Sequence, residues 1–275
     1  MSEHLDNSNI SKVLGKTVDY PNQYDPSILV REPRQSNREH LSLDDNNLPF
    51  CGYDVWNAYE VSCLTKKGLP VTGIAKIVYP CDNKYIVESK SLKLYLNSFN
   101  MTQLGDTSDE ARRLVREHIE DDLSRLLEIN VSATVFAPEQ CPNIIPYFNT
   151  GYSTLENRAG SDELYFNAYN ETPELLAPEF INSQPYMVMQ LYHSSLLKSN
   201  CRVTHQPDWG DVFIAMKGKK VVRPKDLLRY IVSFRDENHF HEEICETIYK
   251  RLWDTFEPKE LAVTCLYARR GGIDI

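Results

Sequence analysis

The chain repeats one order of predicted elements, and this repeat is the feature that most constrains its fold. In each half, two strand-like runs precede a short helical segment, a longer amphipathic helix and a final strand. Residue identities also recur at a constant offset: Leu92, Tyr95, Ser98 and Phe99 match Leu227, Tyr230, Ser233 and Phe234, and Lys90 falls on Lys225. Together they predict two copies of one α+β unit, each with an antiparallel sheet and helices packed on one face.

The elements of each half follow from hydrophobic periodicity and turn signals. The first half is predicted to contain strands over 53–65 and 69–80, helices over 91–100 and 107–128, and a strand over 131–138. The second half is predicted to contain strands over 186–196 and 211–218, helices over 225–235 and 241–256, and a strand over 261–268. Thr107 and Glu110 have the spacing of a capping box at the start of the first long helix.

These elements predict two modules flanked by irregular segments. Residues 1–48 are rich in Asn, Ser, Asp and Pro without a sustained period, and predict an irregular N-terminal arm. The N-terminal module is predicted to cover 49–140 and the C-terminal module 184–275. Residues 141–183 between them are predicted to be a linker.

Charge and cysteine usage narrow the class of function. The formal net charge of -9 argues against a primary role in binding nucleic acid or an anionic membrane, and favours a small-molecule partner. The start, "MSEHLDNSNI", has no apolar stretch behind a basic patch, which predicts a cytoplasmic protein. The seven cysteines form no C-x-x-C pair and no Cys/His cluster at zinc spacing, so we expect reduced thiols and no metal site.

The stretch "SNCRVTHQPDWGD" raises the question whether Cys201 is a nucleophile. Most cysteines of the chain lie in apolar, strand-like runs typical of buried, inert thiols. Cys201 differs because its neighbours Asn200, Arg202, His205 and Asp208 are polar, and reactive thiols need a polar, partly exposed setting. The residues alone leave both interpretations of Cys201 open.

Two further stretches have plain structural interpretations. No G-x-G-x-x-G or Walker A loop is present, so a dinucleotide would bind outside a Rossmann fold. Glu88, Ser89 and Lys90 precede a helical segment, where a capped and solvated helix start is the simplest interpretation. His241 and Glu242 open another helix, where acids complement the macrodipole.

Four segments in order, "ESKSLKLY", "SNCRVTHQPDWGD", "LLRYIVSFRDENHFHEE" and "ARRGGIDI", resemble the NADPH-dependent 7-cyano-7-deazaguanine reductases, the nitrile reductases of queuosine biosynthesis. "LGKTVDYPNQYDPS" near the start extends the resemblance over nearly the whole chain, in the long, two-module form of the family. The resemblance implies two tandem copies of the tunnelling fold, which pterin and purine enzymes share. It also implies a homodimer.

The resemblance implies a reduction of the nitrile to a primary amine through a covalent thioimide. Cys201 would add to the nitrile carbon, which divides one hard step into easier ones. Asp208 would donate a proton to the nitrogen, if an apolar wall such as Trp209 keeps its carboxyl protonated. Two hydrides from two NADPH molecules would follow, with His241 as a proton donor in the later steps. His205 and His118 are expected to be structural.

The resemblance also implies which residues bind the two small molecules. Substrate contacts fall on Val87, Glu88, Ser89, His241 and Glu242. Cofactor contacts fall on Ser89, Lys90, Lys93, Arg269, Arg270 and Gly271. Cations and small residues suit the phosphates of NADPH, which need charge-assisted donors and close backbone approach. Because these residues come from both halves of the chain, the pocket is expected to form between the modules.

Alternative functions of different classes remain open from the sequence. A hydrolase of the GTP cyclohydrolase type would need a zinc site, and the cysteine and histidine spacing counts against one. A non-catalytic purine- or pterin-binding module would use Cys201 and Asp208 only to shape its pocket. Nitrile hydrolysis would start from the same thioimide and differ only in whether water or hydride attacks, so analysis of the product separates the two.

Overall fold

The computed structural model describes residues 23–140, 151–161, 164–180, 186–268 and 271–275. The chain divides into two compact units, which are described separately below. Unit 1 comprises Met1–Ile144 and Arg269–Ile275, and unit 2 comprises Ile145–Ala268. The last residues of the chain thus belong to unit 1, whereas the sequence placed them in the C-terminal module. The physical reason is that the terminal strand pairs with a strand of unit 1.

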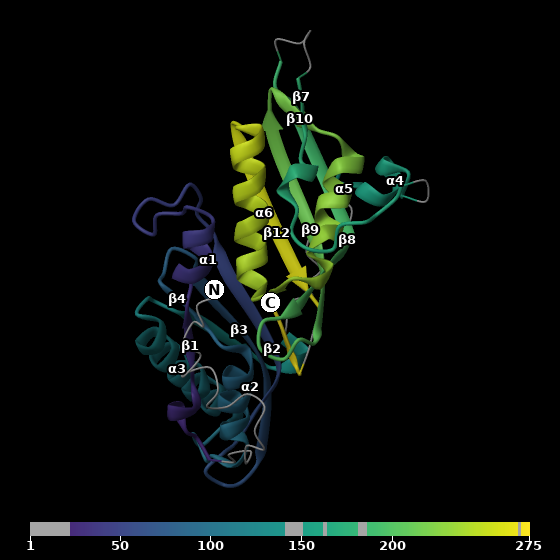
Figure 1. The fold of residues 1–275 in the computed structure, drawn as a ribbon. Coiled ribbons are helices and arrows are strands. Elements are labelled where there is room, and N and C mark those ends of the chain that lie inside the picture. The colour runs from purple at the N-terminus through teal and green to yellow at the C-terminus, as the bar shows by residue number, and fades with distance from the viewer. Residues whose placement is uncertain (1–22, 141–150, 162–163, 181–185, 269–270) are drawn as a thin grey trace. The chain divides into compact units, whose positions relative to one another are not determined.

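Unit 1 is built on a four-stranded antiparallel sheet in the order β13-β2-β3-β5. Its two long strands, β2 and β3, are labelled in Figure 1. The strands are β2 (Tyr53–Leu64), β3 (Pro70–Pro80), β5 (Ser132–Phe136) and β13 (Ile273–Asp274). The helices are α1 (Gln35–His40), α2 (Ser89–Ser98) and α3 (Ser108–Leu127), with short 3₁₀ turns at Pro26–Ile28, Phe99–Met101 and Pro138–Gln140. A separate pair joins β1 (Arg31–Pro33) to β4 (Tyr85–Val87).

Unit 2 repeats this architecture with one additional short strand, β6, in its sheet. Its sheet has the order β11-β8-β9-β12, and β6 also pairs with β8. The strands are β6 (Ser153–Thr154), β8 (Val188–Cys201), β9 (Pro207–Gly218), β11 (Asn238–His239) and β12 (Glu260–Tyr267). The helices are α4 (Leu155–Ala159), α5 (Pro224–Val232) and α6 (His241–Phe256), with 3₁₀ turns at Pro173–Leu175 and Ser233–Asp236. A separate pair joins β7 (Pro178–Phe180) to β10 (Lys220–Val222).

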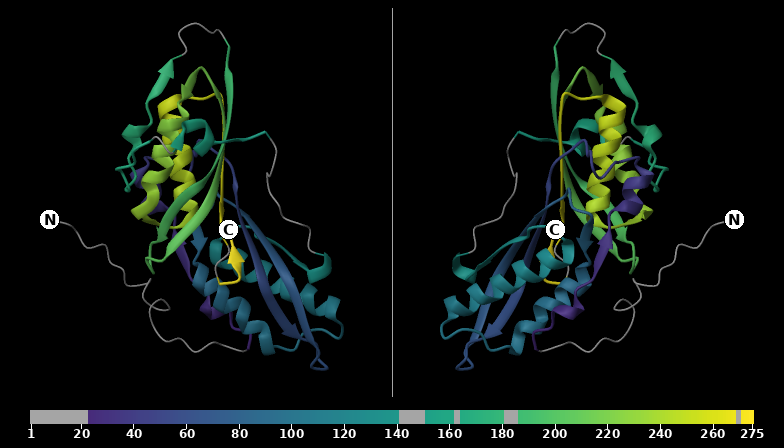
Figure 2. Two further views of the ribbon diagram at one scale, coloured as in Figure 1. Left: turned by 90° about the vertical axis from the view of Figure 1, so that its right-hand side faces the viewer. Right: turned by 90° about the vertical axis from the view of Figure 1, so that its left-hand side faces the viewer.

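Both units are α+β, as predicted, but the sheet of unit 2 is not wholly antiparallel. The long strands β8, β9 and β12 pair antiparallel, whereas the two-residue strands β6 and β11 pair parallel with β8. In each unit the long helix lies along one face of the sheet (Figure 2). The structure therefore confirms helices on one face and corrects the pairing at the edge of unit 2.

Segments predicted to be irregular contain short elements. The predicted N-terminal arm contributes β1 and α1 to unit 1, and the predicted linker contributes β6, α4 and β7 to unit 2. The strand β9 also begins earlier than predicted, at Pro207, so Asp208 lies in a strand and not in a turn. Elements of two to six residues are too short to show a hydrophobic period, which explains why the sequence pattern did not reveal them.

The residue identities that recur between the halves are core contacts of the same kind in both units. Tyr95 and Phe99 pack edge to face with ring centroids 5.3 Å apart at 82°. Tyr230 and Phe234 pack at 5.3 Å and 78°. All four rings are almost fully buried. Aromatic pairs in this arrangement add stabilisation beyond their buried area, so the repeat reproduces a packing unit and not only an order of elements.

The recurring serines make equivalent hydrogen bonds. The Ser98 hydroxyl donates to the Tyr95 carbonyl at 2.6 Å, and the Ser233 hydroxyl donates to the Tyr230 carbonyl at 2.7 Å. The same two hydroxyls accept from the backbone N–H of Asp25 and Thr172, respectively. Ser98 therefore links the end of α2 to the backbone at Asp25, and Ser233 links the end of α5 to the backbone at Thr172.

The long helices form because their apolar residues recur every three or four positions. In α6, Ile244, Ile248, Leu252 and Phe256 follow this spacing and are all buried against the sheet of unit 2. In the part of the chain that the structure describes, no helix combines the length and apolar character that crossing a membrane requires.

The capping box of α3 gives a direct test of the helix start. The Thr107 hydroxyl accepts from the Glu110 backbone N–H at 3.2 Å, and the Glu110 carboxylate accepts from the Asp106 N–H at 2.7 Å. We expect Thr107→Ala to lower the free energy of unfolding by about 1 kcal/mol, because the helix loses a cap. Urea unfolding measures this loss. Ser108→Ala, at the next residue, is the control, and equal losses in the two variants would contradict the capping role.

Candidate functional site

Cys201 lies at the end of the β8–β9 hairpin of unit 2. It is the last residue of β8, its side chain is half-buried, and its backbone closes the turn in both directions. The Cys201 N–H donates to the Gln206 carbonyl at 2.9 Å, and its own carbonyl accepts from the His205 N–H at 2.9 Å. His205 adopts a left-handed conformation with φ of 55° and its ring contacts the Asn238 amide oxygen at 2.7 Å. His205 thus shapes the turn, as the sequence predicted.

Strand register brings Cys201 and Asp208 to the same face of the sheet. Ser199 of β8 lies opposite Asp208 of β9, and Cys201 follows Ser199 by two residues. Because side chains alternate along a strand, Cys201 shares the face of Ser199 and Asp208. Ser199 is fully buried and Asp208 is only 6% exposed. The half-buried Cys201 thiol and the almost fully buried Asp208 carboxyl therefore lie on one face of the sheet.

The short strand β11 places the start of α6 beside Cys201. His239 of β11 lies in register with Cys201, and the Asn200 N–H donates to the Glu237 carbonyl at 2.7 Å. Only Phe240, the N-cap, separates β11 from the first residue of α6. His241 consequently enters the site, where its Nε2 lies 3.2 Å from Oδ2 of Asp208. The structure thus brings together Asp208 and His241, two residues assigned by the resemblance.

Tyr267 holds the His241 ring and was not predicted from the sequence. The two rings stack with centroids 4.1 Å apart at 28°. Tyr267 ends β12 opposite Gly210 of β9, where a Cβ would lie 3.1 Å from the Tyr267 ring. Burial, the largest cause, raises the pKa of the Tyr267 phenol well above its usual value, so the phenol stays neutral. In the sequence this tyrosine only ends an apolar run, which is typical of a core strand.

Trp209 does not provide the apolar wall that was predicted beside Asp208. Successive residues of a strand point to opposite faces, so Trp209 and Asp208 lie on different sides of β9. The Trp209 side chain is 44% exposed, with the Arg235 guanidinium 5.2 Å above its ring. The groups that cover Asp208 are instead His241 and, behind it, Tyr267.

Glu242 is the second residue of α6 and is 7% exposed. Carboxylates are rarely buried to this extent in proteins, and buried ones need donors. Glu242 follows His241 directly, so a carboxylate acceptor lies in the first turn of the same helix. This position suits recognition of a ligand that presents N–H groups.

The predicted substrate residues of unit 1 lie at the start of α2. Val87 ends β4, and Glu88 is the N-cap of α2. The two carboxylate oxygens of Glu88 accept from the backbone N–H groups of Lys90 at 2.9 Å and Ser91 at 2.7 Å. Burial raises the pKa of the Glu88 carboxyl, although these hydrogen bonds oppose the shift. The cap is therefore confirmed for Glu88, but the predicted solvation is wrong there, because Glu88 is 5% exposed.

The predicted cofactor residues of unit 1 fall into one group near α2. Ser89 is exposed at the first position of the helix, and Lys90 and Lys93 follow on it, half-buried. Gly271 has φ of 60°, and a Cβ there would lie 2.9 Å from Nζ of Lys93. The structure thus brings Lys93 and Gly271 together. Arg269 and Arg270 lie outside the described residues.

Among the residues that the structure describes, no three His, Cys, Asp or Glu side chains are grouped so that they could hold a metal ion.

Two family models match residues in both halves of the chain. Residues 20–135 match the family described as "Nitrile reductase, 7-cyano-7-deazaguanine-reductase N-term", and residues 207–275 match "QueF-like protein". The second range contains Asp208, His241 and Glu242. Cys201 precedes it, but lies within the alignment to the relative that covers the whole chain.

Curated relatives are similar over nearly their full length. The NADPH-dependent 7-cyano-7-deazaguanine reductase of Colwellia psychrerythraea is 36% identical over 100% of this chain and 93% of its own. Relatives of the same name from Legionella pneumophila (strain Corby) and Desulfotalea psychrophila are each 38% identical, over 95% and 98% of this chain and 87% and 92% of theirs. These names favour the reductase over the hydrolase and binding-module alternatives. The chain belongs to the 7-cyano-7-deazaguanine reductase family.

Proposed function

We propose that the chain reduces the nitrile of 7-cyano-7-deazaguanine to the primary amine 7-aminomethyl-7-deazaguanine, with NADPH as the donor, in queuosine biosynthesis. The observation that carries the proposal is the placement of Asp208 on the same sheet face as Cys201, with His241 3.2 Å from its carboxylate. A nucleophile, a buried acid and a second proton carrier are the groups that this chemistry needs.

The first step joins the substrate to Cys201. The Cys201 sulfur adds to the nitrile carbon as the thiolate, so that a carbon–sulfur bond forms and one carbon–nitrogen π bond breaks. Negative charge develops on the nitrogen, which takes a proton from Asp208 to give the neutral thioimide. The Asp208 carboxyl is 6% exposed and lies on the same sheet face as Cys201, a position from which it can deliver this proton as a general acid.

Later steps need protons at the same nitrogen. Reduction of a nitrile to an amine takes four electrons, and NADPH, when bound, supplies a hydride for each of the two reductions. The first reduction gives a thiohemiaminal, whose carbon–sulfur bond breaks to release the Cys201 thiolate and leave an imine. His241 lies against Asp208 and stacks on Tyr267, so it is held where it can return a proton to the nitrogen or to Asp208.

Recognition of the base rests on carboxylate acceptors. The guanine-like ring presents a 2-amino group and ring N–H donors, and Glu242 offers a buried acceptor beside His241. We assign Val87, Glu88 and Ser89 to the same ligand by their similarity to the family motif. Each carboxylate oxygen has a second lone pair, so a capping Glu88 keeps acceptor capacity for the base.

The residues near α2 fit the phosphates of NADPH. Lys90 and Lys93 carry ammonium groups, and Gly271 lets backbone approach closely next to Lys93. We assign these residues, with Ser89, Arg269 and Arg270, to binding of NADPH. In this proposal, NADPH is bound through charge-assisted donors and without a Rossmann loop.

The proposal includes the form in which the chain acts. We propose that the two repeated units are tandem tunnelling-fold modules, because they share one order of elements and the same core contacts. The chemistry proposed for Cys201, Asp208 and His241 needs no metal ion. By the same similarity we propose that the chain acts in the cytoplasm as a homodimer, with no direct contact to nucleic acid.

Covalent capture tests the nucleophile. We expect the native chain, incubated with 7-cyano-7-deazaguanine without NADPH, to gain the whole mass of the substrate in intact-protein mass spectrometry. Cys201→Ala should show no gain. Cys51→Ala, which removes an exposed thiol, is the control and should behave as the native chain. Binding of the base without any adduct in the native chain would refute the proposed reaction and favour a binding module.

Substitution of Asp208 tests the proton donor. We expect Asp208→Asn to slow adduct formation roughly 10²- to 10⁴-fold, because the amide cannot release a proton to the nitrogen. The affinity for the base should change little, since the substitution keeps the size and shape of the side chain. Adduct formation at the native rate would exclude Asp208 as the donor.

Gly210 tests whether the Tyr267 ring positions His241. We expect Gly210→Ala to lower kcat/KM roughly tenfold, about 1.4 kcal/mol, because the added methyl displaces Tyr267 and the ring stacked on it. Gly218→Ala is a matched control at the other end of β9, where a Cβ would also be crowded, 3.3 Å from Pro258. Equal losses of activity in the two variants would show that strain in β9 alone is responsible.

A further inference from the structure

We propose that His239, as an imidazolium between two carboxylates, is a positioning residue of the reaction. In this role it holds the turn that follows Cys201 and the first turn of α6 in the arrangement that catalysis needs. The inference rests on the proposed function, and it concerns a residue to which neither the sequence motifs nor the mechanism gave a role.

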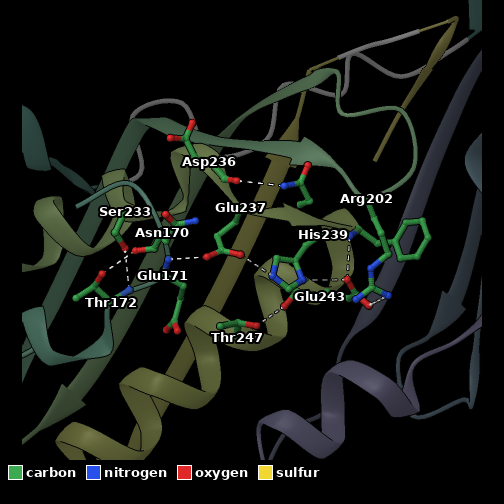
Figure 3. A network of polar contacts seen from close by, with 12 residues as sticks. Asn170, Glu171, Thr172, Arg202, Ser233, Asp236, Glu237, His239, Glu243 and Thr247 are labelled. Atoms are coloured by element: carbon green, nitrogen blue, oxygen red, sulfur yellow. Dashed lines mark hydrogen bonds and ion pairs between the residues drawn. The ribbon is translucent and has the colours of Figure 1, made fainter. Parts of the chain in front are cut away.

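Both ring nitrogens of His239 face carboxylate oxygens (Figure 3). Nε2 lies 3.1 Å from Oε2 of Glu237, and Nδ1 lies 3.2 Å from Oε2 of Glu243. A neutral imidazole donates from only one nitrogen, and the lone pair of the other would then face a carboxylate. Two carboxylates at these distances therefore favour the doubly protonated ring.

Glu243 connects this ring to both sides of the site. Its Oε1 lies 3.0 Å from Nη1 of Arg202, the residue after Cys201. Its Oε2 accepts from the Phe240 backbone N–H at 3.0 Å, which caps α6 directly before His241. Glu243 is 3% exposed, so these contacts are made out of solvent. One carboxylate thus fixes the turn of the nucleophile and the start of the helix that carries His241.

Glu237 connects the same ring to the interior of unit 2. Its Oε1 accepts from the Glu171 backbone N–H at 2.8 Å. The Glu171 carboxylate in turn accepts from Tyr230 at 3.0 Å and from Arg251 at 3.1 Å. The chain of contacts therefore runs from a core tyrosine through His239 to the turn after Cys201, and movement of that turn would disturb each link.

The charge on His239 depends on the groups that surround it. Burial lowers the pKa of the ring, but the hydrogen bond and charge of Glu243 and the charge of Glu237 outweigh burial and the opposing charge of Arg202. The net effect raises the pKa above its usual value. Cys201 lies in register with His239 on β8. Because the folded pKa is raised, the stabilisation is complete below the ordinary pKa of histidine and is lost as pH rises through the folded value.

The ratio of adduct-formation rates tests the inference, with 7-cyano-7-deazaguanine as the probe and no NADPH. We expect His239→Gln to form the adduct roughly tenfold more slowly than the native chain at a pH below the raised pKa. The ratio of the native rate to the His239→Gln rate should approach one as pH rises through that pKa, because the native ring then also loses its charge.

Two further variants separate positioning from general destabilisation. His193→Gln removes a histidine that lies 2.9 Å from Asp211 elsewhere on the β8–β9 pair, and its ratio should stay near one at every pH. His239→Lys retains a cation that donates to both carboxylates, and should restore much of the lost rate. A ratio for His239→Gln that is the same at every pH, with no rescue by lysine, would overturn the inference.

NMR titration of the His239 ring in the native chain measures its pKa independently of the reaction. A pKa at or below the ordinary value of histidine would overturn the inference even if the adduct forms. Absence of the adduct in the native chain would instead refute the proposed function, so the two failures are distinguishable.

Discussion

Two residues of parallel strand pairing determine the geometry of the candidate site. Asn238 and His239 pair with Asn200 and Cys201, and the N–H of Asn200 donates to the carbonyl of Glu237. This pairing brings the start of α6 to the end of β8. His241 then reaches Asp208, and Glu243 reaches Arg202 in the turn after Cys201, because both residues lie in the first turn of the helix that follows β11.

The site gathers an unusual number of buried acids at one end of a sheet. Asp208, Glu242 and Glu243 are each less than a tenth exposed. Burial of a carboxylate is costly unless it is paired. Arg202 and His239 lie beside Glu243, and His241 lies beside Asp208. The acids differ in their contacts. Glu243 contacts the Arg202 and His239 side chains and the Phe240 N–H, whereas Asp208 faces His241.

Much of the fold could be predicted from the sequence because its elements are long and periodic. The β8–β9 hairpin and α6 extend over enough residues to show their period, and the recurrence of Tyr95 as Tyr230 marked a packing unit that both halves share. The strands β6 and β11 were missed because two residues carry no period. Without β11, no pattern in the sequence could place His239 against Cys201.

The site could be predicted in part, and for a different reason. Cys201, Asp208 and His241 were identified by similarity to a family motif, and the structure brings Asp208 and His241 together. The assignment of a wall to Trp209 failed because it used proximity along the chain, whereas strand alternation sends that side chain to the opposite face. Tyr267 was missed since its contact with His241 depends on a glycine in a neighbouring strand.

A crystal structure of the chain with 7-cyano-7-deazaguanine and without NADPH would show whether Cys201 attacks the nitrile. We expect a bond between the Cys201 sulfur and the former nitrile carbon, with the Asp208 carboxyl about 3 Å from the nitrogen. His241 should still stack on Tyr267. A base bound with its nitrile away from an unmodified Cys201, or a nitrogen that faces neither Asp208 nor His241, would contradict this expectation.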